Sequence, residues 1–172
     1  LLRAYEPAKQ LVPNSRLIVV GPGTRLRRGY ERLVSSRGLK DVVFAGYVPY
    51  VDLPRYYRTA HIFCAPATGE ESFGIVLLEA MAASKPIVAS NIEGYASVAT
   101  QGVDGLMVPP RDENALAQAI TLLLKDEGLR HQMGARGRVK AEEYRWKHIA
   151  QRVMDYYLAL LNNVPAKSTK GN

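Results

Sequence analysis

Two glutamates separated by an apolar stretch are the residues of this chain whose types and spacing indicate chemistry. Glu71 and Glu79 enclose a seven-residue run of Ser, Phe, Gly, Ile, Val and two Leu. Turn residues precede the pair, and the apolar pattern predicts that a helix begins near Phe73. If both acids lay on that helix, about 12 Å of helix axis would separate them. That spacing fits the length of a sugar diphosphate and not a pair of catalytic carboxylates.

The backbone at the start of such a helix is suited to bind a phosphate. The first N–H groups, on Gly74, Ile75 and Val76, would lie at the positive end of the helix dipole. Gly74 has no Cβ atom to hold a phosphate off the backbone. Each flanking carboxylate can accept two hydroxyl hydrogen bonds, as a vicinal diol requires. The residues alone also fit a simpler interpretation, in which Glu71 caps the helix and Glu79 is a solvated side chain.

The segment around these acids resembles a known signature. Residues Glu71–Ala83, followed by Lys85–Ser90, are similar to the donor-domain signature of glycosyltransferase family 4, and the similarity extends from about Leu1 to Leu161. The members of that family are retaining enzymes with the two-domain GT-B fold. The resemblance implies an α/β fold with a Rossmann-like parallel sheet flanked by helices, the C-terminal, donor-binding half of such an enzyme.

The resemblance also implies a role for each matched residue. Glu71 would be the catalytic residue that contacts the transferred sugar, and Glu79 would bind the ribose hydroxyls of the nucleotide. The amides that would hold the donor sugar and its diphosphate belong to Phe73, Gly74, Ile75 and Val76.

A second segment matches the loop that the family places beside the nucleobase. It covers Phe44–Pro49, where the side chain of Tyr47 or Val48 would pack on the base. Packing of Tyr47 on the domain surface is an open alternative. The aromatic pair Tyr56 and Tyr57 that follows is expected to pack in the core or between domains and not to contact a ligand.

The chain departs from the family pattern in two places. Ser84 stands where the family usually has glycine, so a left-handed backbone there would cost about 1 kcal/mol unless the turn differs. Within Asn91–Ser97, Glu93 and Ser97 replace the first of two glycines and a glutamate. A related departure, together with Cys64–Pro66, is similar to the phosphatidylinositol mannosyltransferases of the family.

The composition fits one α/β domain. Of the 172 residues, 47% are hydrophobic and 23% are charged, and no apolar run approaches the roughly 18 residues that span a bilayer. The lone Cys64 lies in an expected core strand, so an intrachain disulfide is excluded and a reducing cytoplasm is the expected location.

The formal net charge of +7 indicates an affinity for polyanions. Basic residues gather at Arg25–Arg28 and over Arg130–Lys147 without an interleaved aromatic platform of the kind that stacks bases, so nucleic acid is not an expected partner. Peripheral contact with an anionic membrane stays open, because a well-placed Lys or Arg favours such a surface by about 1 kcal/mol. Metal-ligand spacing is lacking, in line with the metal independence usual in GT-B enzymes, so neither a metal nor another cofactor is expected.

Apolar runs bounded by turn residues alternate with amphipathic stretches, which predicts a mostly parallel sheet with helices on both faces. The expected strands are Arg16–Val20, Val42–Ala45, His61–Ala65, Pro86–Ala89 and Gly105–Val108. The expected helices lie near 1–11, 25–37, 52–59, 73–83, 95–100, 127–142 and 146–161, with a further helix that follows an N-cap at Asp112 and buries Leu116, Ile120 and Leu123.

These elements form one expected nucleotide-sugar-binding domain over residues 1–161. The family's domain begins with a strand before the helix at 1–11, so the sheet is expected to lack its first strand. The N-terminal acceptor-binding domain of the family is expected to be absent as well. Residues 162–172 are polar and are expected to form a disordered tail.

The implied function is the transfer of a hexose from a nucleoside diphosphate sugar, GDP-mannose or a UDP-sugar, to an acceptor hydroxyl. This chain alone is expected to be inactive, because the acceptor would bind to the other domain. A non-catalytic nucleotide-binding module of doubly wound fold is the alternative, and such a module would not need Glu71. A sugar-nucleotide 2-epimerase shares the GT-B plan but needs catalytic acids that the sequence does not offer.

Overall fold

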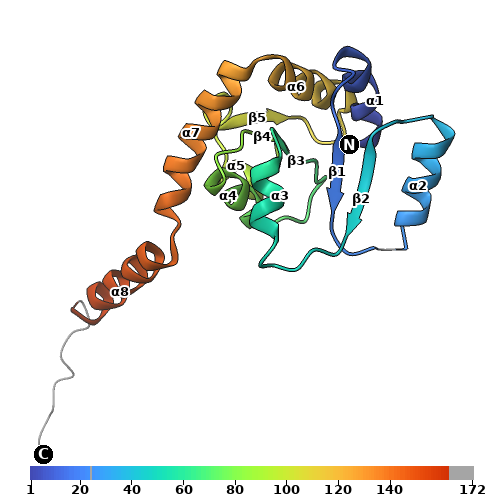
Figure 1. Ribbon diagram of the computed structural model, residues 1–172. Helices are drawn as coiled ribbons and strands as arrows, with labels where there is room; N and C mark the ends of the chain where they lie inside the picture. The colour runs from blue at the N-terminus through green and yellow to red at the C-terminus, as the bar shows by residue number, and fades with distance from the viewer. Residues whose placement is uncertain (24, 163–172) are drawn as a thin grey trace, which may run out of the picture.

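The computed structural model describes residues 1–23 and 25–162, and it has parallel strands covered by helices (Figure 1). The strands are β1 (Leu17–Val20), β2 (Val42–Gly46), β3 (Phe63–Ala65), β4 (Ile87–Ser90) and β5 (Gly105–Val108). The helices are α1 (Leu2–Leu11), α2 (Arg27–Ser36), α3 (Leu53–Thr59), α4 (Ile75–Ala82), α5 (Glu93–Ala96), α6 (Glu113–Lys125), α7 (Glu127–Glu143) and α8 (Trp146–Asn162). The expected α/β, Rossmann-like class is confirmed.

The strands form two parallel sheets and not one. In the first sheet β1 pairs with β2, and in the second the order is β3-β4-β5. Every residue of β4 is buried, whereas β1 alternates between partly buried and exposed positions. The expectation of a missing first strand stays a prediction. Parallel pairing places the carboxyl ends of β3 and β4 at one edge, from which the loop with Glu71 leaves.

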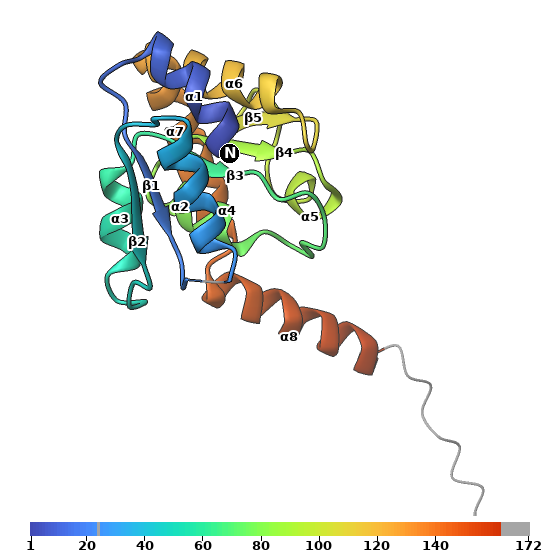
Figure 2. The same ribbon diagram turned by 90° about the vertical axis from the view of Figure 1, so that its right-hand side faces the viewer.

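The core packs mainly around β4. On one side lie α1 and α6, which run side by side in both views (Figures 1 and 2). The predicted stripe of Leu116, Ile120 and Leu123 is buried there, and the Asp112 side chain accepts a hydrogen bond from the Ala115 amide at 2.8 Å, as an N-cap does. On the other side α4 packs against α7. Helix α8 extends away from the sheets in both figures.

Several expected boundaries are shifted in the structure; β3, for example, begins at Phe63 and not at His61. The helix near 73–83 begins at Ile75, and the helix near 95–100 is Glu93–Ala96, because the carbonyl of Ile92 accepts the amide hydrogens of Tyr95 and Ala96. Asn162, assigned to the tail, is the last residue of α8. The rest of the expected tail, residues 163–172, lies outside the described residues.

The lone cysteine behaves as an apolar side chain. Cys64 packs against the buried cluster around Val88, and burial raises the pKa of its thiol to about 12. The thiol therefore stays protonated at neutral pH and contributes packing to β3, which agrees with its expected place in a core strand.

A buried ion pair ties α7 to the loop before β5. Asp104 is fully buried and binds the ammonium group of Lys140, which also donates to the carbonyl of Val98 at 3.0 Å and to the hydroxyl of Thr100 at 2.7 Å. Because Lys140 compensates the charge of Asp104, removal of the lysine would leave an uncompensated carboxylate in the core.

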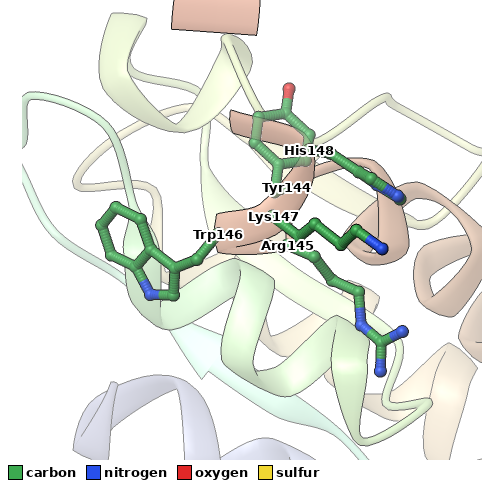
Figure 3. Close-up of a pocket in the computed structure, with 5 residues that line it drawn as sticks. All are labelled: Tyr144, Arg145, Trp146, Lys147 and His148. Atoms are coloured by element: carbon green, nitrogen blue, oxygen red, sulfur yellow. The ribbon is translucent and has the colours of Figure 1, made fainter. Parts of the chain in front are cut away.

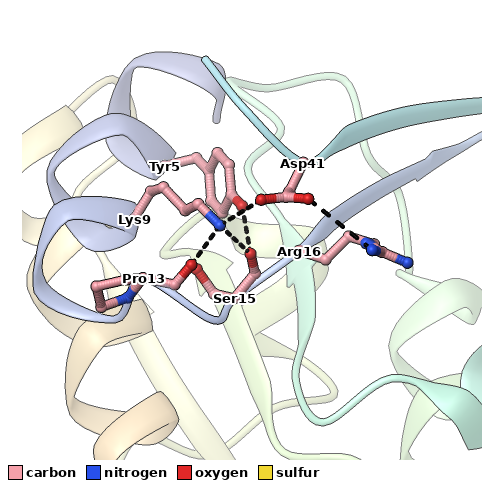
Figure 4. A network of polar contacts seen from close by, with 6 residues as sticks. All are labelled: Tyr5, Lys9, Pro13, Ser15, Arg16 and Asp41. Atoms are coloured by element: carbon pink, nitrogen blue, oxygen red, sulfur yellow. Dashed lines mark hydrogen bonds and ion pairs between the residues drawn. The ribbon is translucent and has the colours of Figure 1, made fainter.

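A second polar network fixes α1 to the first sheet (Figure 4). The Lys9 ammonium group donates to the Ser15 carbonyl and to the Asp41 carboxylate, both at 2.7 Å, and the Tyr5 hydroxyl donates to the same carbonyl at 3.0 Å. The hydrogen bond and charge of Lys9 lower the pKa of Asp41. These contacts hold the end of α1 where β1 and β2 begin.

Ser84 adopts the left-handed backbone that its family position requires, so the alternative of a different turn is wrong. Its φ angle is 58°, and it follows the C-cap residue of α4, Ala83, at the turn into β4. The turn cannot shift easily, because a Cβ atom on Gly134 of α7 would lie only 2.2 Å from the Ser84 carbonyl oxygen. Ser84 therefore keeps the backbone strain that a side chain has at positive φ.

We expect the substitution Ser84→Gly to raise the free energy of unfolding by about 0.5–1 kcal/mol, measured by urea denaturation. Glycine removes the cost of a Cβ atom in the left-handed region, and its larger unfolded-state entropy offsets part of that gain. Gly134→Ala is the matched control and should destabilise the protein. If the stability of the Ser84→Gly variant were unchanged or lower, the claim that Ser84 is strained would be wrong.

Candidate functional site

The candidate site is the junction between the loop after β3 and the first turn of α4. Gly74 makes the turn with a φ angle of 79°, so that α4 starts one residue later. The Glu71 carboxylate oxygen Oε1 accepts the amide of Gly74 at 3.1 Å and lies 3.4 Å from the amide nitrogen of Phe73. Glu71 lies before the first turn, so it is not the first-turn cap of the simpler interpretation, although its carboxylate does engage the amide of Gly74, the residue that precedes the helix. Because Glu71 precedes the helix, the 12 Å estimate of its axial distance to Glu79 does not apply.

The next two amides remain available. Within residues 1–23 and 25–162, no acceptor lies at the amides of Ile75 and Val76. Ile75 is 60% exposed and Val76 is 38% exposed, so the end of the helix faces solvent and is not covered by core. Helix α4 has eight residues, and its dipole adds positive potential at this end. The junction can therefore accept an anionic group.

Helix α5 fixes the loop by a close backbone approach. A Cβ atom on Gly94 would lie 2.0 Å from the carbonyl oxygen of Glu71, and a Cβ on Gly74 would lie 2.8 Å from the Tyr95 ring. Gly94 is the glycine that the chain keeps beside the replaced position Glu93. Burial, and then the charge of Glu71, raise the pKa of Tyr95, so the Glu71 carboxylate also lies near this ring. Helix α5 therefore fixes the position of the loop, while the amides of Ile75 and Val76 stay accessible.

The end of α7 supports the loop from another direction. The ring of Tyr144 packs on the ring of Phe73 with centroids 5.9 Å apart, and the Arg152 guanidinium lies 6.0 Å from the Tyr144 ring centroid. An open hollow of about 590 Å³ lies at the bend between α7 and α8, where residues 144–148 line it (Figure 3). Its side chains point in different directions in Figure 3, so we regard the hollow as the concave side of the bend and not as a binding site.

Glu79 lies about one turn after Ile75, the first residue of α4. Its side chain has a partner that the sequence did not indicate. The hydroxyl of Tyr57, on α3, donates to its carboxylate oxygen Oε2 at 2.7 Å. The Tyr56–Tyr57 pair had only a packing role in the sequence interpretation. No local pattern indicates this contact, because the two residues are far apart in sequence and belong to different helices.

The expected nucleobase contacts differ in their exposure. Tyr47, directly after β2, is 73% exposed, whereas Val48 is only 8% exposed. Of the two side chains, only that of Tyr47 is free to pack on a ligand without rearrangement. The assignment of this loop to a nucleobase stays a prediction.

The structure brings Glu71, Gly74 and the two free amides together at one helix end, with Glu79 on the same helix. No helix in the described part of the chain is long and apolar enough to cross a membrane. Among the same residues, no three His, Cys, Asp or Glu side chains gather as metal ligands. The chemistry that the junction supports is anion binding by backbone amides, and the carboxylates of Glu71, before the helix, and Glu79, within it, can accept hydroxyl hydrogen bonds.

Comparison with known proteins gives a consistent result. The model of the family "Glycosyl transferases group 1" matches residues 1–140. The phosphatidyl-myo-inositol mannosyltransferase of Mycobacterium leprae is 36% identical over 159 residues, which are 91% of this chain and 41% of the relative. The chain therefore spans less than half the length of this relative.

Solved structures with the same fold include the following two. Sucrose-phosphate synthase from Thermosynechococcus elongatus superposes with a TM-score of 0.82 at 31% identity, over 94% of this chain and 42% of that one. Anabaena Alr3699/HepE in complex with UDP superposes with a TM-score of 0.80 at 22% identity, over 92% of this chain and 44% of that one. The latter likeness shows the fold alone.

We expect Gly94→Ala to lower the free energy of unfolding by about 1–3 kcal/mol, because the new methyl group overlaps the Glu71 carbonyl and must displace the loop. Urea denaturation measures the loss, and the amide NMR shifts of Phe73 and Gly74 should move. Gly29→Ala in α2 is the control, since nothing lies within 4 Å of its Cβ position. A Gly94→Ala variant that behaves like this control would show that the close approach is not a constraint.

Proposed function

The chain belongs to the glycosyl transferases group 1 family, and from this membership we propose that it is the donor-binding part of a retaining glycosyltransferase. The donor is a nucleoside diphosphate hexose, and the acceptor is a hydroxyl group. The observation that carries the proposal is the solvent-facing start of α4, where the amides of Ile75 and Val76 are free and the Glu71 carboxylate lies at the Gly74 amide.

The diphosphate binds at the amides of residues 73–76. The bond between the anomeric carbon and the diphosphate oxygen breaks during transfer, and negative charge develops on the leaving group. Amides that are already oriented stabilise this charge without reorganisation in the transition state. A bound diphosphate competes with the Glu71 carboxylate for the amides of Phe73 and Gly74. Glu71 is then released to accept hydroxyl hydrogen bonds from the sugar.

Glu79 binds the ribose, and the loop with Tyr47 lies beside the base. The name of one relative supports a sugar donor, because that protein, 36% identical over 91% of the chain, is a mannosyltransferase. GDP-mannose and a UDP-sugar are the two donors that we propose to compare. No metal takes part, because the backbone amides and the helix dipole supply the positive potential for the diphosphate.

The acceptor binds to an N-terminal domain, which lies beyond this chain. The acceptor oxygen and any group on the opposite face of the sugar come from that domain, so the chain alone binds nucleotide weakly and transfers no sugar. The protein works in the cytoplasm. Its net charge of +7 favours peripheral contact with an anionic membrane surface.

The contact of Glu71 with the Gly74 amide favours one alternative, a nucleotide-binding module in which this acid is only structural. The two functions differ in what they require of the Glu71 side chain. A catalytic donor site needs it for the sugar, whereas a binding module needs only the amides.

We expect Glu71→Ala to abolish the preference of the chain for sugar nucleotides over free nucleotides. Affinity for UDP-glucose and GDP-mannose should fall by about tenfold, since hydrogen bonds to a charged group are lost. Affinity for UDP and GDP should stay or rise, because the amides of Phe73 and Gly74 become free. Titration followed by NMR measures all four ligands.

Glu70→Gln is the control, since it removes a neighbouring charge without touching the amides. An equal effect of Glu71→Ala on all four ligands would favour the binding module. Failure of the unaltered chain to bind any of the four at millimolar concentration would overturn the donor site itself.

A further inference from the structure

We propose that Tyr57 is a positioning residue that holds Glu79 in the orientation that binds ribose; this inference rests on the function proposed above. Its hydroxyl donates to Glu79 Oε2 at 2.7 Å, a bond between α3 and α4. The two residues come from separate helices, so this bond joins the helix that follows the Tyr47 loop to the helix that binds the diphosphate.

The phenol is itself held rigidly. Its ring contacts the ring of Phe63 on β3, with centroids 5.4 Å apart and planes inclined by 56°. Both rings pack against the buried cluster that contains Leu77 and Met81 of α4. A tyrosine ring has only two side-chain torsions, and here packing against β3 and α4 restricts both. The hydroxyl is therefore a fixed donor, to which the more flexible glutamate adapts.

The direction of the hydrogen bond is fixed as well. Burial, followed by the hydrogen bond and charge of Glu79, raises the pKa of Tyr57, so the phenol keeps its proton at every physiological pH. Since it can only donate to a carboxylate, Glu79 stays the acceptor. Oxygen Oε2 is engaged by Tyr57, and Oε1 keeps its lone pairs for hydroxyl donors of a ligand.

This arrangement preorganises the acid. A free glutamate on a helix surface samples several rotamers, and a ligand that needs one of them must bear the cost of selecting it. The Tyr57 hydroxyl selects one rotamer before the ligand arrives. Only ligands that bind Glu79 gain affinity from this preselected rotamer. The positioning role of Tyr57 can therefore be distinguished from a general effect on folding.

The test compares UDP and GDP with their dideoxyribose analogues, which lack both ribose hydroxyls, in NMR titrations of the 172-residue chain. Tyr57→Phe removes only the hydroxyl and keeps the ring contact with Phe63. Affinity for UDP and GDP should fall by about fivefold to tenfold, in the range of a hydrogen bond to a charged group. Affinity for the analogues should not change. Tyr56→Phe, on the same helix, is the matched control and should leave all affinities unchanged.

A second arm asks whether the effect passes through Glu79. In a Glu79→Ala background, where the acceptor is gone, adding Tyr57→Phe should change no affinity further. Three outcomes would each overturn the positioning role. Tyr57→Phe could weaken the binding of ribose and dideoxyribose ligands equally, or it could leave the affinity for UDP and GDP unchanged or raised. It could also weaken binding further in the Glu79→Ala background. Absence of binding by the unaltered chain would overturn the proposed function and this inference with it.

Discussion

The close contact between the backbone of α5 and the loop before α4 is the constraint on which the site depends. Gly94 allows the Glu71 carbonyl to approach where any side chain would collide. Gly74 can then turn the chain through a left-handed conformation, and the first amides of α4 face solvent. Tyr144 adds a ring contact to Phe73 from the end of α7. A loop held at several points presents its amides in a fixed array, which a flexible loop would have to form at the time of binding.

The two acids of the site are held in different ways, and their roles follow from this difference. Glu71 is held by the same amides that a diphosphate would use, so its position depends on what else is bound. A diphosphate carries more negative charge than one carboxylate and has more oxygen atoms to accept hydrogen bonds, so it is the stronger competitor. Glu79 is held by a partly buried phenol that no ligand needs to displace. One acid therefore responds to the donor, and the other is ready before it arrives.

Much of the fold follows from local sequence patterns. The stripe of Leu116, Ile120 and Leu123 is visible as periodicity and β4 as a mostly apolar run, and the cap at Asp112 is a local hydrogen bond. The contacts that shape the site are not local. Gly94 meets Glu71, and Tyr57 meets Glu79, only after the chain has folded, and the division into two sheets depends on which strands pair. The family resemblance located the acids, but it said nothing of the packing that orients them.

The central claim is that the start of α4 binds the diphosphate of a nucleotide. The most direct measurement is an amide NMR titration of the assigned 172-residue chain with UDP and with GDP. The account predicts that the largest shift changes fall on Gly74, Ile75 and Val76, followed by Glu71 as its carboxylate leaves the amides. Binding with the largest changes at the bend of residues 144–148 and none at residues 73–76 would contradict it.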